Sequence, residues 1–367
     1  MRFLWIPAVS GTLFLSILAG CSGSNYSSAS PATPVLTQLH TMTTIGSTVD
    51  SENGDDNPYG LAIAPMTTGY VTAGDILVCN FNDKSGNAGY GTTIEDLSPT
   101  AGATPKRIAQ DPSLRGCAAL ASNPSNGYIW AAAYTANDIP IFTGSGKLMS
   151  TVAPNTQWTN PWGETYAAPQ MATYSGTPSP TFYVSNATSG TVDRVVVTSS
   201  ATTVTPIATG FPVNLASQYG ILAPAGLTYN PQTDTLYVVS SEDNSIVAIA
   251  GVSSVPANGI TVSASTYGAL TFSGPGASQA SVVYSGAPLN NPVSAALLYN
   301  GNLVIGDTGD NNILELDPLQ KKIVGQKLVD NGNAGAIFGI VTTGTSATTQ
   351  KIYFNDDNSN SVVSITQ

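Results

Sequence analysis

The chain has 367 residues, of which 42% are hydrophobic and 9% are charged, and its formal net charge is −11. A disordered chain would be poorer in apolar residues and richer in charge, so the composition predicts a folded protein. Only 11 residues are Lys or Arg, which excludes the basic surface that nucleic acids or anionic lipids require, and we expect no nucleic-acid partner. The 36 Gly and 24 Pro residues disfavour a helical bundle and favour short strands joined by turns.

The N-terminal residues are predicted to form a targeting signal that precedes the folded domain. Arg2 supplies positive charge, and the apolar stretch 3–18 is too short to span a membrane comfortably. The stretch ends in Leu-Ala-Gly-Cys at 18–21, which resembles the lipobox of bacterial lipoproteins. This resemblance implies a signal peptide over residues 1–20 and a lipid on Cys21, which becomes the mature N-terminus. The alternative is an ordinary signal peptide with a chance Cys.

The residues after Cys21 indicate where such a lipoprotein would reside. Ser22 stands where an Asp tends to retain bacterial lipoproteins at the inner membrane. We therefore expect a cell-envelope protein: at the outer membrane, facing the periplasm, in a Gram-negative host, and otherwise on the outer face of the cytoplasmic membrane. Residues 21–34 are rich in Ser, Ala and Pro and are predicted to form a flexible tether. The lipid is then the only membrane contact that we expect.

Internal repeats dominate the rest of the chain. Each repeat consists of an apolar strand, a polar turn and a second apolar strand, at 75–97, 128–142, 181–195, 235–249, 302–316 and 351–365. A second motif precedes each repeat and carries a small residue at Gly60, Ala119, Gly163, Gly226, Ser294 and Gly339. Repeats of roughly 50 residues are typical of propeller blades, and small residues let strands crowd around an axis. We predict an all-β, six-bladed β-propeller of four-stranded antiparallel blades over residues 35–367.

The two ends of the repeat array predict how the ring closes. The last blade stops at Gln367 after its third strand, whereas the β-prone stretch Val35–Ile45 precedes the first blade without a partner. We predict that this stretch supplies the missing outer strand beside residues 360–366, so that no open edge remains. The alternative is a seventh, degenerate blade, for which we find no further small-residue motif. The Gly-, Ser- and Pro-rich segment Ser253–Pro275 is expected to be a surface excursion of blade four.

One repeat carries a family resemblance. The sequence LVIGDTGDNNILELDP at 303–318 resembles the core of the NHL repeat, which has a strand, an Asp-x-Gly-x-Asn turn and a second strand. The pattern extends over roughly residues 35–367, although blade two has Ala133 where the repeat has Asp or Asn. The resemblance implies a propeller and says little about function, because this fold hosts many activities.

Histidine chemistry has a single candidate residue. His40 is the only histidine, so a Ser-His-Asp or Cys-His mechanism would have to use it. Streptogramin lyases, whose architecture resembles this one, use histidine chemistry near the axis. His40 lies in the predicted closing strand at the outer rim, so we expect a surface or half-buried strand residue without a catalytic role.

Glu164 breaks the apolar pattern of the inner strands. The equivalent positions of the other blades are apolar, namely Leu61, Leu120, Leu227, Ala295 and Ile340. An unpaired buried carboxylate is very costly, so Glu164 is expected to have a partner. Arg115, directly before the inner strand of blade two, is the candidate. We predict a structural ion pair between them, and a role in binding a ligand or a metal is the alternative.

Carboxylates in the predicted turns are candidate calcium ligands, together with Glu164. In such turns the Asp or Asn side chain usually accepts hydrogen bonds from N–H groups of its own turn, and this is the interpretation that we favour. Calcium is the alternative, because it prefers carboxylate and amide oxygens, and propellers of the gluconolactonase and paraoxonase types hold a metal near the axis. The candidates are Asp243, Asp307 and Asp356. No turn matches a calcium-loop signature, so no cofactor is assigned.

Aromatic residues stand at the starts of three inner strands, at Tyr59, Trp162 and Phe338. They are expected to ring the mouth of the central tunnel, where propellers usually bind ligands. Their role is either to pack the blades or to form a binding platform. With Arg115 and Glu164 they make up the candidate ligand-binding set.

Cys79 and Cys117 remain available for pairing if Cys21 carries the lipid, since an oxidising compartment favours disulfides. In the repeat register, Cys79 lies near the end of the second strand of blade one, and Cys117 begins the inner strand of blade two. Both are therefore expected on one face of adjacent blades, where a disulfide can join them. Two unrelated buried thiols are the alternative.

Two classes of function follow from these features. The first is a non-catalytic binding scaffold on the cell envelope that holds a protein, a glycan or a cell-wall component on its loop face. The second is a calcium-dependent hydrolase or lactonase of the gluconolactonase or paraoxonase type, with a ring of acids at the tunnel. We favour the binding scaffold, because the sequence offers neither an axial histidine nor a calcium-loop signature.

Overall fold

The computed structural model describes residues 33–152, 158–167, 180–198, 201–217, 220–264 and 269–367. Cys21, the predicted signal peptide and nearly all of the predicted tether lie outside these ranges. Within them, no helix is both long and apolar enough to cross a membrane.

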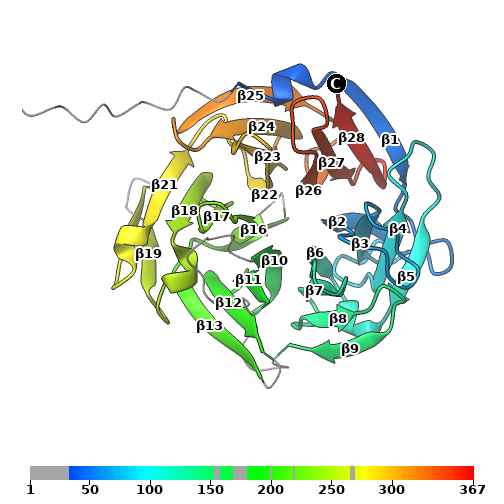
Figure 1. The fold of residues 1–367 in the computed structure, drawn as a ribbon, viewed down its shortest axis with the longest axis horizontal. Coiled ribbons are helices and arrows are strands. Elements are labelled where there is room, and N and C mark those ends of the chain that lie inside the picture. Colours follow the sequence, from blue (N-terminus) through cyan, green and yellow to red (C-terminus); the bar gives the residue numbers. More distant parts are fainter. Residues whose placement is uncertain (1–32, 153–157, 168–179, 199–200, 218–219, 265–268) are drawn as a thin grey trace, which may run out of the picture. The chain divides into compact units, whose positions relative to one another are not determined.

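In the described part of the chain, six antiparallel blades of four strands surround a central axis, which confirms the predicted propeller (Figure 1). The innermost strands are β2 (Asp56–Ile63), β6 (Cys117–Ser122), β10 (Pro161–Ala167), β16 (Pro224–Asn230), β22 (Pro292–Leu297) and β26 (Ile337–Thr343). The second strands are β3 (Ile76–Asn82), β7 (Ile129–Ala133), β11 (Thr181–Asn186), β17 (Thr235–Ser240), β23 (Leu303–Asp307) and β27 (Lys351–Asp356). The third strands are β4 (Thr93–Leu97), β8 (Pro140–Phe142), β12 (Thr191–Val197), β18 (Ser245–Ala250), β24 (Asn312–Asp317) and β28 (Ser361–Thr366). The outer strands are β5 (Lys106–Gln110), β9 (Leu148–Thr151), β13 (Thr202–Thr209), β21 (Ala280–Ser285), β25 (Lys322–Leu328) and β1 (Thr41–Ser47).

The ring closes as predicted, with an N-terminal strand in the last blade. β1 pairs antiparallel with β28, from Thr41 opposite Thr366 to Ser47 opposite Ser361. Chain segments from the two ends of the propeller therefore share one sheet (Figure 1). This leaves no unpaired edge on β28 for another chain to pair with.

The first part of the predicted closing strand is not a strand, and that part of the prediction was wrong. Residues Leu36–Gln38 form the 3-10 helix η1. The Glu315 carboxylate accepts the backbone N–H groups of Val35 and Leu36, each at 2.7 Å. These N–H groups are consequently not available to a strand ladder, and the Val35, Leu36 and Leu39 side chains are buried between blades five and six instead.

The prediction for Ser253–Pro275, the segment that follows the third strand of blade four, was also wrong. Its strands β19 (Ile260–Ala264) and β20 (Leu270–Ser273) form a hairpin, and β19 pairs in parallel with β13. The segment Ser253–Pro275 therefore extends the sheet of blade three and is not a separate excursion of blade four. The remaining short elements are η2 (Pro112–Leu114), η3 (Val252–Ser254), η4 (Ala277–Gln279), β14 (Asn214–Ser217) and β15 (Gly220–Leu222).

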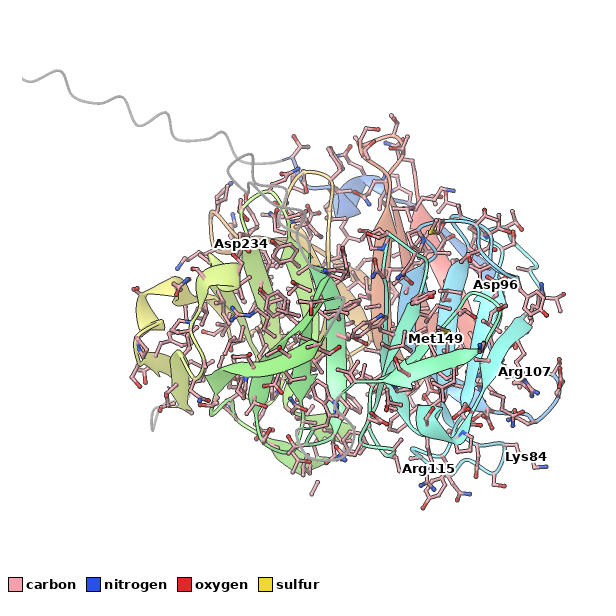
Figure 2. The ribbon with its side chains drawn as sticks, turned by 60° about the horizontal axis from the view of Figure 1, so that its bottom comes forward. Lys84, Asp96, Arg107, Arg115, Met149 and Asp234 are labelled. Atoms are coloured by element: carbon pink, nitrogen blue, oxygen red, sulfur yellow. A yellow bond between two sulfur atoms is a disulfide. The ribbon has the colours of Figure 1, made fainter. Side chains whose placement is uncertain are left out.

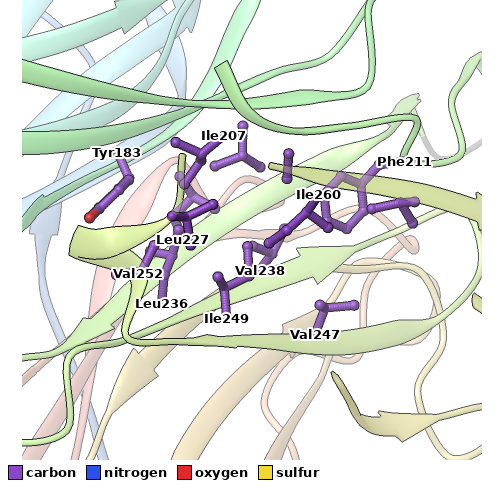
Figure 3. Packing of buried hydrophobic residues seen from close by; sticks show 14 of the residues in the cluster. Tyr183, Ile207, Phe211, Leu227, Leu236, Val238, Val247, Ile249, Val252 and Ile260 are labelled. Carbon is purple, nitrogen blue, oxygen red and sulfur yellow. The ribbon is translucent and has the colours of Figure 1, made fainter. Parts of the chain in front are cut away.

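Apolar side chains fill the junctions between neighbouring blades. Among the described residues, each of the six junctions has its own buried cluster. Between blades three and four, Tyr183 and Ile207 pack with Leu227 and Val238, and Ile260 of the β19 strand joins them (Figure 3). Burial of this apolar surface is the main force that holds the blades together.

The small residues of the inner strands allow the close approach that the sequence predicts. A Cβ added to Gly163 would lie 2.0 Å from the Ala225 carbonyl oxygen, and one added to Gly339 would lie 2.3 Å from that of Tyr59. Each of these contacts crosses from one blade to the next. A larger side chain at either position would force neighbouring inner strands apart.

Turn asparagines connect consecutive blades. The side-chain oxygens of Asn137, Asn244, Asn311 and Asn360 accept N–H groups at the start of the next blade, at 2.6, 2.6, 3.0 and 2.8 Å. All four have positive φ, a conformation that Asn tolerates better than most residues. The expectation that such side chains usually bond within their own turn therefore does not hold for these four amide oxygens, which accept N–H groups of the next blade.

The junction between blades one and two contains the predicted disulfide. Cys79 and Cys117 are bonded, with their Cα atoms 5.9 Å apart. Cys79 lies on β3 and Cys117 begins β6, so the repeat register placed both residues correctly.

Candidate functional site

The axial tunnel is the candidate site. Side chains from all six inner strands line it, and those at the level of Glu164 border two cavities: Leu61, Leu120, Glu164, Leu227, Ala295 and Ile340. We call this set the axial ring. The cavity towards the starts of the inner strands, the upper chamber, has a volume of about 70 Å³. The cavity towards their ends, the lower chamber, has a volume of about 340 Å³.

An aromatic cluster stands at the mouth of the upper chamber. Tyr59 lies between two rings, with its centroid 4.2 Å from Phe81 and 3.7 Å from Phe338, both stacked. Trp162 meets Tyr59 edge-on at 5.7 Å and Tyr134 at 5.4 Å. The structure thus brings together the three predicted aromatics. Trp162 is buried, whereas Tyr59 and Phe338 are half-buried, so the three rings pack around the axis and two of them keep part of their surface in contact with solvent.

Phe81 and Tyr134 were missed by the sequence analysis, although the repeat register contains a signal for them. Each directly follows an aligned turn position, Asn80 or Ala133. In the last blade the equivalent residue is Asp357, which lies close enough to Tyr59 to raise the pKa of its hydroxyl, although burial of Tyr59 is the larger cause. The residue after the aligned turn position therefore marks the tunnel mouth.

Acidic side chains accompany the aromatic cluster. Burial raises the pKa of Asp357 to about 6, and the neighbouring Asp56 and Asp356 add to the increase. The pKa of Asp56 is raised first by burial and then by Asp55 and Asp83. These mutual effects show that several carboxylates share the loop face, the face at which inner strands begin and second strands end.

Among the described residues Glu164 has no partner, so the predicted ion pair with Arg115 was wrong. Its side chain is 6% exposed, and neither carboxylate oxygen forms a hydrogen bond with any described residue. Burial raises the pKa of Glu164 well above its ordinary value. Arg115 is exposed at the edge of the domain, where its guanidinium lies 5.4 Å from the ring centroid of Tyr90 (Figure 2). There the guanidinium keeps its hydration, which burial beside Glu164 would remove.

The candidate calcium ligands do not gather into a site. Asp243 accepts hydrogen bonds from the Ser240 and Ser245 hydroxyls, and Asp356 accepts one from Ser359 at 2.7 Å. Asp307 accepts the N–H of Asn290 at 3.1 Å, and burial raises its pKa to about 8.

Each turn acid thus serves its own turn or the adjoining connection, and none joins Glu164 at the axial ring. Among the described residues, no three His, Cys, Asp or Glu side chains come together in a way that could hold a metal. The calcium alternative therefore does not fit the donor set that these residues provide.

His40 lies where the sequence predicted it, directly before β1 at the outer rim. Its side chain is exposed, and its backbone N–H donates to the Thr366 carbonyl at 2.8 Å. His40 therefore belongs to the outer seam of the ring, and axial histidine chemistry has no residue to carry it in this chain.

Comparisons with known proteins support the fold. No protein-family model and no curated protein matches the sequence. A streptogramin B lyase structure is 15% identical with a TM-score of 0.53, and the match covers 91% of this chain and 99% of that chain. A gluconolactonase-like protein is 12% identical with a TM-score of 0.54, covering 92% and 96%. A chain of the nidogen/laminin complex is 13% identical with a TM-score of 0.53, covering 83% and 98%.

These similar structures include enzymes and a protein captured in a complex, so they establish the six-bladed propeller and leave its activity open. The class of this protein is therefore a propeller with a divided axial tunnel. One mouth of this tunnel is aromatic and acidic, and its middle contains a single carboxyl group.

Proposed function

We propose that this protein is a lipid-anchored binding propeller of the bacterial cell envelope that holds a partner with cationic side chains on its loop face. One observation carries this proposal: the Asp357 carboxylate lies near the half-buried Tyr59 ring, which stacks on Phe338, and Asp56 lies near Asp357. The proposal keeps the binding-scaffold function and selects a basic protein segment from the partners that the sequence left open.

The chemistry of this mouth suits a cation. Lysine and arginine groups are attracted to the faces of aromatic rings and pair with carboxylates. Burial raises the pKa of Asp357, and repulsion by Asp56 and Asp356 adds to the increase, so a bound cation would relieve an existing cost. The net charge of −11 would also steer a basic partner towards the domain.

The envelope anchor rests on the lipobox-like sequence at 18–21. A lipid on Cys21 and a Ser/Ala/Pro-rich tether would display the propeller beside the membrane while leaving its loop face accessible. The variant Cys21→Ser is expected to lose metabolic lipid labelling and to become soluble. Unchanged membrane fractionation would contradict the anchor.

The test of the loop face uses two synthetic peptides of equal length, one Lys-rich and one Glu-rich. The Lys-rich peptide should bind with an affinity that falls as salt rises, and the Glu-rich peptide should not bind. The double variant Asp56→Asn, Asp357→Asn should weaken binding strongly, whereas Glu242→Gln, which removes a charge from the same face in blade four, three blades away from Asp56, should weaken it less. Equal binding of both peptides, or unchanged binding by the double variant, would contradict the proposal.

The same preparation tests the hydrolase alternative. A binding propeller of the proposed kind should show the same melting temperature before and after treatment with a calcium chelator. A large fall in melting temperature that calcium reverses would favour the hydrolase instead.

A further inference from the structure

Glu164 has no structural task that the structure reveals. The equivalent positions of the other blades are apolar, and Leu61, Leu120 and Leu227 fill three of them. A leucine at position 164 would therefore meet the packing requirements of the propeller. The carboxyl group nevertheless stands in the middle of the tunnel with both oxygens unbonded by any described residue and with 6% of its surface exposed.

No Lys or Arg side chain in the described part of the chain pairs with this carboxyl. The ion pairs formed by the described residues join Arg107 to Asp50 and Glu52 in blade one. Arg115, the expected partner, is exposed and stacked near Tyr90. Among the residues that line the two chambers Glu164 is the only charged one, and Tyr59 and Tyr166 are the only others that titrate.

Glu164 is surrounded by a ring of apolar side chains, which we call the apolar collar, and it borders a larger, more polar cavity. Leu61, Leu120, Leu227 and Ile340 surround it at the axial ring, and the lower chamber of about 340 Å³ begins there. Further down, hydroxyl-bearing residues join the lining of that chamber, namely Ser122, Thr165, Tyr166, Thr228 and Thr342. A small molecule in the lower chamber therefore meets Glu164 from the side opposite the aromatic mouth, and the side chain has to turn towards the chamber to expose its two oxygens, which are buried in this structure.

We propose that the lower chamber binds a small organic cation, with its ammonium group against the Glu164 carboxylate and its methylene groups against the apolar collar. An ammonium supplies the N–H donors that both carboxylate oxygens lack. It also places opposite charge beside an acid in surroundings of low dielectric, where a charge pair is stronger than in water. An anion would be repelled, and a neutral molecule would leave a charged carboxylate without compensation.

Binding of the ammonium is coupled to a proton. Burial favours the neutral acid in the empty tunnel, so an ammonium that forms the charge pair displaces the Glu164 proton to solvent. The groups that could take part in this equilibrium are Glu164 itself and the hydroxyls of Tyr59 and Tyr166, whose pKa values are raised by burial. The tyrosine hydroxyls stay protonated at neutral pH, so one acid, Glu164, supplies the proton.

The test is calorimetric titration of the folded protein with n-butylammonium chloride and with 1-butanol, its neutral counterpart of similar shape. Butylammonium should saturate a single site, and the heat should change between two buffers of different ionisation enthalpy because a proton is released. Glu164→Gln should weaken binding by about 30-fold or more, and 1-butanol should not saturate the site in either protein.

Glu164→Leu is the second variant, because leucine occupies the equivalent position in three other blades. It should melt cooperatively and should not bind butylammonium. Equal binding of butylammonium and butanol, undiminished binding by either variant, or failure of the wild-type protein to saturate would each overturn the proposal. The proposal does not depend on the loop face, because the peptide experiment probes Asp56 and Asp357 and this experiment probes Glu164.

Discussion

Glu164 and Glu315 are both buried glutamates of one propeller, and their surroundings are opposite. One oxygen of Glu315 accepts the N–H groups of Val35 and Leu36 at 2.7 Å, and the other accepts the side-chain N–H of Asn302 at 2.6 Å. Its side chain is fully buried. Glu164 is 6% exposed, and it accepts no hydrogen bond from any described residue.

The difference separates two uses of a buried acid. Glu315 fastens η1 to blade five across 279 residues of sequence, and its hydrogen-bonding capacity is spent inside the fold. A buried carboxyl with unused acceptors destabilises the domain unless it interacts with something else. We therefore regard the seam around Glu315 as structural and the tunnel around Glu164 as the part of the molecule that meets a ligand.

Removing residues 33–47 should have the largest effect, because it deletes η1 and β1 together. The β28 edge would lose its whole partner strand, and the apolar cluster between blades five and six would be open to water. We expect loss of the cooperative thermal transition and aggregation through the exposed edge, measured by circular dichroism and light scattering. A matched variant that lacks only residues 1–32 should melt as the wild-type protein does. A cooperative transition in the variant that lacks residues 33–47 would show that η1 and β1 are dispensable.

Glu315→Leu breaks the structural side of the comparison with a single substitution. It leaves three buried donors without an acceptor: two backbone N–H groups and the Asn302 amide. At about 1–3 kcal/mol for each unsatisfied group, we expect the free energy of unfolding to fall by roughly 3–9 kcal/mol, measured by urea denaturation. Glu315→Gln keeps one acceptor oxygen, so its free energy of unfolding should fall by less. If Glu315→Leu were as stable as the wild-type protein, the hydrogen bonds of Glu315 would not stabilise the attachment of η1 to blade five.

The disulfide between blades one and two provides a second structural reference. It closes a separation of 38 residues, so loop-closure entropy predicts a contribution of about 3–4 kcal/mol. The double variant Cys79→Ala, Cys117→Ala should lose about this much in urea denaturation, whereas Cys21→Ser should lose none. A double variant of unchanged stability would mean that the inner-strand contacts alone hold this junction.

The repeat register explains which features could be predicted from sequence. The number of blades, the closing strand and the Cys79–Cys117 pair all depend on which positions are equivalent in the repeats, and a pattern that recurs six times specifies these positions well. Phe81 and Tyr134 could have been predicted in the same way, because they occupy the same register position in two blades. We missed them by considering only the starts of the inner strands.

Other features depend on side-chain directions that no register contains. Glu315 takes the N–H groups of Val35 and Leu36, which lie far away in sequence, and so replaces a predicted strand by η1. Arg115 has the right position along its blade to reach the axis, but its side chain extends outwards to Tyr90. The pairing of Glu164 was therefore predicted wrongly, although its burial at an apolar position was predicted correctly.

The smallest effect is expected for Glu164→Leu, and its sign should be opposite to that of Glu315→Leu. Burial raises the pKa of Glu164 in the folded protein above the ordinary 4.5, so the folded chain binds this proton more tightly than the unfolded chain does. The contribution of this proton to stability is full below about pH 4.5 and is lost as the pH rises towards the folded-state pKa, with a slope of up to about 1.4 kcal/mol per pH unit.

Leucine at position 164 removes this pH dependence. The stability of the variant relative to the wild-type protein should therefore increase as the pH rises. Near pH 5 the two should differ little, and at pH 8 we expect Glu164→Leu to be the more stable protein, measured from urea denaturation at both pH values. Taking the difference between the two proteins cancels the other buried acids, such as Asp307, because both proteins contain them. Glu242→Gln should leave the profile of the wild-type protein unchanged. Parallel profiles for Glu164→Leu and the wild-type protein would show that Glu164 is already compensated within the fold, and the contrast with Glu315 would then disappear.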